Sequence, residues 1–269
     1  MDKRIVSPTG KSKPLAPVRP SAAIEAAYRR KLDALIREMS ESLVYWVKAA
    51  YRKTPPIMAQ DASPAQVIER AMRRLTQRWQ RRFDDIAPEM ATWFATAAAM
   101  RSDAAMKAIL KRGGMTVAFQ WTPATKDAFH ATVAENVGLI KSIAAEHLSA
   151  VQGDVMRSVA AGRDLGTMAK TIEARYGITK KRAAFISRDQ NNKATAVITR
   201  ARQVELGITQ ARWLHSAGGR VPRPSHVKAS RDGLIYDVAK GALIDGEYIF
   251  PGQLPNCRCV SVPIVAGFT

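Results

Sequence analysis

Near the C-terminal end of the sequence, one histidine and two cysteines carry side chains that can bind a metal ion or act as nucleophile and base. They are His226, Cys257 and Cys259. Thiolate and imidazole groups suit Zn²⁺, and His215 is a candidate fourth ligand. A single Cys-x-Cys pair, however, is a weaker zinc signal than paired Cys-x-x-Cys motifs. We therefore expect packed structural thiols and no cofactor, with zinc at these three residues as the alternative.

The same residues could form a catalytic dyad, in which His226 deprotonates Cys257 or Cys259. Such a nucleophile needs a base within hydrogen-bond reach. The sequence around the cysteines has no signature of a known cysteine-dependent enzyme. A Cys/His-dependent hydrolase is thus an alternative, and we predict that the protein is not an enzyme and has no small-molecule substrate. His130 and His147 lie in predicted helices and are expected to be ordinary surface or core residues.

An ordered series of polar residues surrounds these cysteines and predicts a structural network. Its members are Arg188, Asp189, Gln190, Arg220, Arg223, His226, Asp232, Asn256, Cys257, Arg258 and Cys259. The first three lie on the apolar stripe of a predicted helix, where unsatisfied polar groups cost several kcal/mol. We expect Arg220, Arg223, Asp232 and the backbone around Asn256 to satisfy them. Such a network can specify a fold without performing chemistry.

The order and spacing of this series resemble the phage head morphogenesis family typified by the Mu F protein. The distinctive pieces are the arginine-rich turn that ends in His226, a following glycine, and the closing Asn256-Cys257-Arg258-Cys259. The resemblance covers roughly residues 130–265. One departure is the spacing of Arg220 and Arg223, which are three apart where the family usually has Arg-Val-Arg. The resemblance implies a minor head protein of the virion, at the portal vertex or inside the capsid, with no established enzymatic activity.

The overall charge favours a polyanionic partner. The chain of 269 residues has 42 Lys and Arg against 23 Asp and Glu, a formal net charge of +19. Self-repulsion of this size is relieved by nucleic acid, the commonest polyanion. No apolar run approaches the ~20 residues needed to span a bilayer, and the N-terminus lacks the apolar segment of a secretory signal. We therefore expect no membrane partner and synthesis in the host cytoplasm.

Part of this positive charge is concentrated in a ridge of arginines on one predicted helix. Spacings of three and four put six of them on one predicted helix face: Arg70, Arg73, Arg74, Arg78, Arg81 and Arg82. The ridge could be an ordinary solvated face, or it could neutralise phosphates of double-stranded DNA without sequence preference. We favour phosphate binding. An acidic surface of a portal protein, or contact with the major capsid protein, would satisfy the same arginines.

The spacing of apolar residues, together with the prolines and glycines that end helices, predicts the elements that position these residues. We predict a basic proline-rich arm over residues 1–20, a basic helical region over 21–120 and a head morphogenesis module over 121–269. The fold class is mainly α: an elongated helical region followed by a small α+β module with short strands and ordered loops. Helices are expected from Ser21 to before Pro55, from Ser63 to Arg112 with a kink or an interruption at Pro88, and from Thr122 to about Gln152.

Two more helices are expected over residues 165–176 and 179–206, separated by a turn at Gly177-Ile178. This pair also resembles a helix-turn-helix, so a DNA-binding regulator is a second alternative. The second helix would measure ~40 Å at 1.5 Å per residue, longer than a usual recognition helix. We therefore rank the regulator below the head protein. The alternating residues 260–264 predict a final strand, and Pro263 suggests that it is an edge strand.

Overall fold

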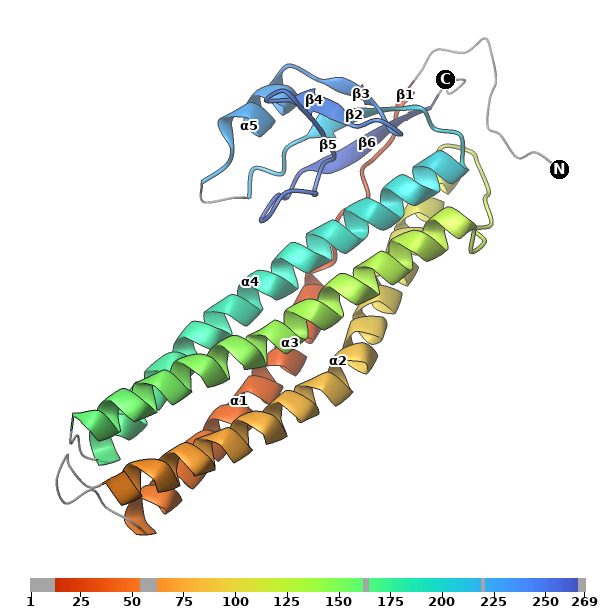
Figure 1. Cartoon of the computed structure of the whole chain (residues 1–269). Coiled ribbons are helices and arrows are strands. Elements are labelled where there is room, and N and C mark those ends of the chain that lie inside the picture. The colour runs from red at the N-terminus through yellow and green to blue at the C-terminus, as the bar shows by residue number, and fades with distance from the viewer. Residues whose placement is uncertain (1–12, 54–61, 162–164, 219–220, 266–269) are drawn as a thin grey trace. The chain divides into compact units, whose positions relative to one another are not determined.

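The computed structural model describes residues 13–53, 62–161, 165–218 and 221–265. Within these ranges the chain forms four long helices, followed by one short helix among short antiparallel strands (Figure 1). The long helices are α1 (Ala22–Lys53), α2 (Ala62–Arg112), α3 (Pro123–Ala160) and α4 (Leu165–Glu205). The prediction of a mainly α fold with a small C-terminal α+β module is confirmed. None of the described helices is apolar enough over a sufficient length to cross a bilayer.

Two predicted helix ends, at Gly153 and Gly177, are wrong, and α2 is not interrupted at Pro88, where a kink or an interruption was predicted. α2 continues through Pro88, α3 continues seven residues beyond Gly153 to Ala160, and α4 continues through Gly177. A helical glycine costs about 1 kcal/mol relative to alanine, and a proline removes one backbone hydrogen bond. The buried apolar residues on either side of each site stabilise the helix by more than this. Because α4 is one helix, the predicted turn is absent and the helix-turn-helix reading loses its basis.

The strands form one sheet of four and one hairpin. The sheet has the order β1-β6-β2-β3 and the hairpin joins β4 to β5. Their bounds are β1 Lys13–Pro14, β2 Gln210–Leu214, β3 Ile235–Asp237, β4 Ala242–Ile244, β5 Glu247–Ile249 and β6 Val260–Val265. The short helix α5 (Pro224–Arg231), which was not predicted, lies between β2 and β3 in the chain. It begins with Pro224, whose fixed φ suits a first helical position.

The prediction that Pro263 marks an edge strand is wrong. β6 lies between β2 and the two-residue strand β1, with all neighbouring strands antiparallel. Proline is tolerated there because the Pro263 carbonyl accepts a hydrogen bond from the Leu15 N–H at 2.9 Å, which requires no donor from the proline. The end of the predicted N-terminal arm is thus ordered by the chain's own β6, and Val18 is buried in the core next to it. The rest of the arm, residues 1–12, lies outside the described residues.

The chain divides into two compact units that each contain parts of the long helices. The first unit consists of residues 1–25, 93–133 and 188–269, and the second of residues 26–92 and 134–187. In the first, Trp213 is fully buried at the centre of the strand region. In the second, apolar stripes of the helices bury Tyr28, Leu32 and Phe83. The predicted boundary at residue 121 stays a prediction.

The second unit contains a buried histidine whose ring touches two hydroxyl groups. His147 on α3 lies 3.3 Å from the Ser40 hydroxyl through Nε2 and 2.8 Å from the Thr179 hydroxyl through Nδ1. Burial, helped by the positive charge of Arg175, lowers the pKa of His147 from 6.5 to about 4. The neutral ring is therefore the form that the folded unit holds.

We expect this histidine to make the second unit less stable in mild acid. Since the pKa of His147 is lower in the folded than in the unfolded chain, its contribution to stability is complete above pH 6.5 and is lost as the pH falls towards 4. Between pH 7 and pH 5 the loss is about 2 kcal/mol. Urea unfolding at both pH values measures it. The control is His147→Gln, which keeps hydrogen-bonding groups without titrating; an equal loss in this variant would contradict the assignment.

Candidate functional site

Polar residues of α4 hold the loop that carries the cysteines. The Asp189 carboxylate accepts a hydrogen bond from the Asn256 backbone N–H, and it also pairs with Lys193 at 3.2 Å. The Asn192 amide donates to the Cys257 carbonyl at 3.2 Å. Asn256 has φ +60°, a left-handed conformation that asparagine tolerates better than most residues. The loop is therefore fixed to α4 by side chains that reach its backbone on both sides of the bend.

The short helix α5 brings His226 to both cysteines. His226 Nδ1 lies 3.6 Å from the Sγ atom of Cys257 and 3.6 Å from that of Cys259. All three side chains are buried, with exposed fractions of 3% for His226, 4% for Cys257 and 3% for Cys259. The ring of Trp213 packs edge-on against His226, with 5.0 Å between ring centroids. These residues, separated by about thirty positions in the sequence, form one compact group that could hold a metal ion.

The two thiols of this group differ in acidity. The pKa of Cys257 is lowered to about 5, first because the Cys259 thiol donates a hydrogen bond to its sulfur, although burial opposes the shift. Backbone N–H groups of Cys259 and Gly252 also donate to the Cys257 sulfur. Cys259 is held in the protonated form beside this thiolate, so the pKa of its thiol is raised. Cys257 is therefore the more acidic of the two thiols.

Three arginines of the predicted network border a cavity beside this group. The cavity has a volume of about 400 Å³ and its lining includes Arg188, Arg223 and Arg258. Arg223 donates to the Pro255 carbonyl at 3.1 Å, and Arg258 donates to the Gly218 carbonyl. The Nε of Arg188 is buried and has no hydrogen-bond partner among the described residues. The structure therefore brings Arg223 and Arg258 to neighbouring loops, and Arg188 to the cavity wall.

The remaining predicted network residues lie in different surroundings. Asp232 is exposed at the end of α5, where its carboxylate pairs with Lys228 at 2.8 Å and Arg231 at 3.2 Å. Gln190 is buried on α4. His215 also borders the cavity, and its Nδ1 accepts the Ala217 N–H at 3.1 Å. Arg220 lies outside the described residues.

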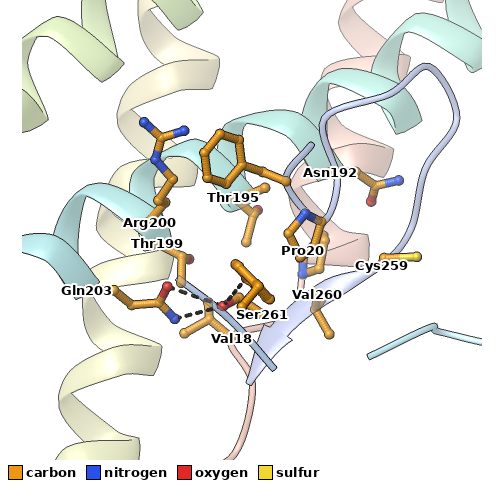
Figure 2. A pocket seen from close by; sticks show the side chains of 14 residues that line it. Val18, Pro20, Asn192, Thr195, Thr199, Arg200, Gln203, Cys259, Val260 and Ser261 are labelled. Atoms are coloured by element: carbon orange, nitrogen blue, oxygen red, sulfur yellow. Dashed lines mark hydrogen bonds between the residues drawn. The ribbon is translucent and has the colours of Figure 1, made fainter. Parts of the chain in front are cut away.

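A second polar cluster, which sequence reasoning missed, joins α4 to β6. The Gln203 side chain hydrogen-bonds the Ser261 hydroxyl at 3.2 Å (Figure 2). The Tyr236 hydroxyl donates to the same oxygen at 2.7 Å. The space between them is about 20 Å³, enough for one water molecule and too small for a substrate. A signal existed in the sequence, because a stripe of polar residues recurs at helical spacing on the buried face of α4: Asn192, Thr195, Thr199 and Gln203.

The arginine ridge lies along the exposed side of α2, in the second unit. All six arginines are exposed. Arg73 pairs with Glu69 at 3.3 Å, and Arg82 pairs with Glu38 at 3.1 Å. Three others, Arg70, Arg74 and Arg78, border an apolar groove of about 520 Å³ that also contains Trp46. The ridge is therefore a charged surface next to an exposed aromatic residue.

Comparison with known proteins places the cysteine loop and its supporting helix in one family. Residues 149–262 match the family described as Phage Mu protein F like protein. The chain is also 30% identical over 254 residues to an uncharacterized protein of Haemophilus influenzae, covering 93% of this chain and 55% of the relative. The chain thus spans about half the length of that relative. No solved structure matches the chain. The matched segment contains all of α4 and α5, both cysteines and the first half of β6, and so the chain carries a phage Mu protein F-like domain over residues 149–262.

Proposed function

We propose that this chain is a minor head protein of a tailed phage, acting as a structural connector in the head without enzymatic chemistry. The observation that carries the proposal is the Mu F-like domain, because that family consists of structural proteins of phage head morphogenesis. The geometry of the cysteine loop supports the non-enzymatic part. A nucleophilic thiol needs access to a substrate, whereas Cys257 and Cys259 are only 4% and 3% exposed and could be reached only through the adjoining cavity that they help to line.

The proposed partners are the portal protein or the major capsid protein, and packaged double-stranded DNA. Trp46 of α1 beside the arginines of α2 favours a protein contact at the groove that these two helices line, since tryptophan and arginine dominate binding energy at protein interfaces. The net charge of +19 and the exposed ridge favour phosphate contacts. Purified particles test the first part: the chain is expected to co-purify with the head and to dissociate together with portal or capsid subunits. Its absence from heads would overturn the proposal.

DNA binding is expected to depend steeply on salt and not on sequence. A suitable variant replaces Arg70, Arg74, Arg78 and Arg81 by glutamine, because none of these pairs with a carboxylate among the described residues. Each lost phosphate contact lowers the slope of log affinity against log salt by about 0.9, so four contacts lower it by nearly 4. Fluorescence anisotropy with two unrelated duplexes measures the slope.

The matched control removes the same charge elsewhere. Four exposed lysines on other elements serve for this: Lys126, Lys170, Lys181 and Lys240. Their replacement by glutamine is expected to leave most of the salt dependence in place. Equal losses in the two variants would mean that the net charge, and not the ridge, attracts DNA. No binding by the unmodified protein at low salt would remove DNA as a partner.

A further inference from the structure

The group formed by His226, Cys257 and Cys259 has the geometry of a metal site, and this holds whether or not the head function is correct. Zn²⁺ binds thiolate at about 2.3 Å and imidazole at about 2.0–2.1 Å, so a tetrahedral site separates sulfur from nitrogen by about 3.6 Å. Both Nδ1–Sγ distances are 3.6 Å, and the three ligand atoms all lie within 4.8 Å of one another. We propose that these three residues bind one Zn²⁺ ion, which fastens α5 to the loop that precedes β6.

The surroundings of the sulfurs favour thiolates, which are the form that binds a metal. Backbone N–H groups of Gly252 and Cys259 donate to the Cys257 sulfur. The Trp213 indole N–H interacts with the Cys259 sulfur, and it has no oxygen or nitrogen acceptor among the described residues. Hydrogen bonds of this kind orient metal ligands and stabilise their charged form. The sulfur of a neutral thiol is a weaker acceptor for these donors than a thiolate.

Charge balance also fits a divalent cation. Two thiolates carry a charge of −2, which Zn²⁺ cancels, so the loaded site is neutral and is not repelled by Arg188, Arg223 and Arg258 around the cavity.

His226, Cys257 and Cys259 all border the cavity, which leaves room for a fourth ligand. His215 borders that cavity but lies outside the group of three ligand atoms, and its Nδ1 already accepts the Ala217 N–H. A water molecule in the cavity is therefore the fourth ligand that we assign. Coupling α5 to the cysteine loop gives the metal a structural role, since the strand region has short strands and long connections.

The metal content of the full chain, purified from zinc-supplemented cells, tests the site. We expect one zinc per chain in the unmodified protein and in His130→Ala, whose histidine is exposed and distant in sequence. Cys257→Ser, Cys259→Ser and His226→Ala are expected to lose the metal. Retention of zinc by any of these three variants, or its absence from the unmodified protein, would overturn the proposed ligand set.

Measurements on the unmodified protein keep the test decisive if a variant fails to fold. Replacement of zinc by Co²⁺ is expected to give near-ultraviolet bands of thiolate-to-cobalt charge transfer. Zinc is also expected to protect both thiols from a disulfide reagent until a chelator is added. Thiols that react equally with and without zinc, or a Cys257–Cys259 disulfide found by mass spectrometry, would contradict the site. Because none of these readings depends on particles or DNA, their failure would leave the head function untouched.

Discussion

Arg202→Met is expected to lower the free energy of unfolding of the first unit by about 3–5 kcal/mol, the usual cost of breaking a buried ion pair. The Arg202 side chain is only 3% exposed and donates two hydrogen bonds to the Asp103 carboxylate, at 2.8 and 2.7 Å. It also donates to Glu205 at 2.7 Å and to the Gln120 carbonyl at 2.5 Å. Methionine fills similar volume, but it leaves the two carboxylates together without a cation.

The measurement is urea unfolding followed by circular dichroism, and Arg182→Met provides the control. Arg182 lies on the same helix and pairs with Glu146 at 2.7 Å, but its side chain is 37% exposed. Pairs in contact with solvent contribute about 0.2–1 kcal/mol, so this variant should unfold near the midpoint of the unmodified protein. Similar losses of unfolding free energy in both variants would show that the burial of Arg202 does not strengthen its ion pairs.

The sequence predicts those parts of the fold that depend on neighbouring residues, and it predicts less well those that depend on packing between distant segments. The long helices follow from apolar spacing, and residues such as Leu32, Met39 and Leu43 are buried as that spacing predicts. Helix ends were predicted from single residues, and packing overrode them at Gly153 and Gly177. Propensities of about 1 kcal/mol are too small to decide such cases against a buried helix face.

The candidate site shows the same difference between local patterns and contacts of distant residues. The sequence alone made the cysteine loop a candidate site, because its motif is local and ordered. Its partners were less predictable, since side chains such as Asn192 and Ser261 meet across long sequence separations that only the loop conformation determines. The same reason explains Asp232, whose local lysine and arginine neighbours on α5 take its carboxylate. Which partner a polar side chain takes depends on its distance to each possible partner in the folded chain. Sequence patterns do not give those distances.

Gly252→Ala is expected to destabilise the first unit by about 2–5 kcal/mol, the sum of two separate costs. Gly252 has φ +83°, and a side chain in the left-handed region costs about 1–2 kcal/mol. A Cβ atom there would also lie 2.8 Å from the Cβ of Ala196 on α4, which is a steric overlap. Overpacking of this kind costs about 1–3 kcal/mol. Urea unfolding measures the total.

Two further variants separate these costs. Gly246 has the same φ of +83° but nothing within 4 Å of an added Cβ, so Gly246→Ala is expected to show only the conformational cost. Adding Ala196→Gly to Gly252→Ala removes the overlapping atom, and the double-mutant cycle should therefore give a favourable coupling. Equal effects at Gly246 and Gly252 would mean that the loop is not pressed against α4. In that case only the hydrogen bonds with the Asp189 and Asn192 side chains would hold the cysteine loop to α4. The proposed zinc ligands on the loop would then be less rigidly placed than the close approach of Gly252 to α4 implies.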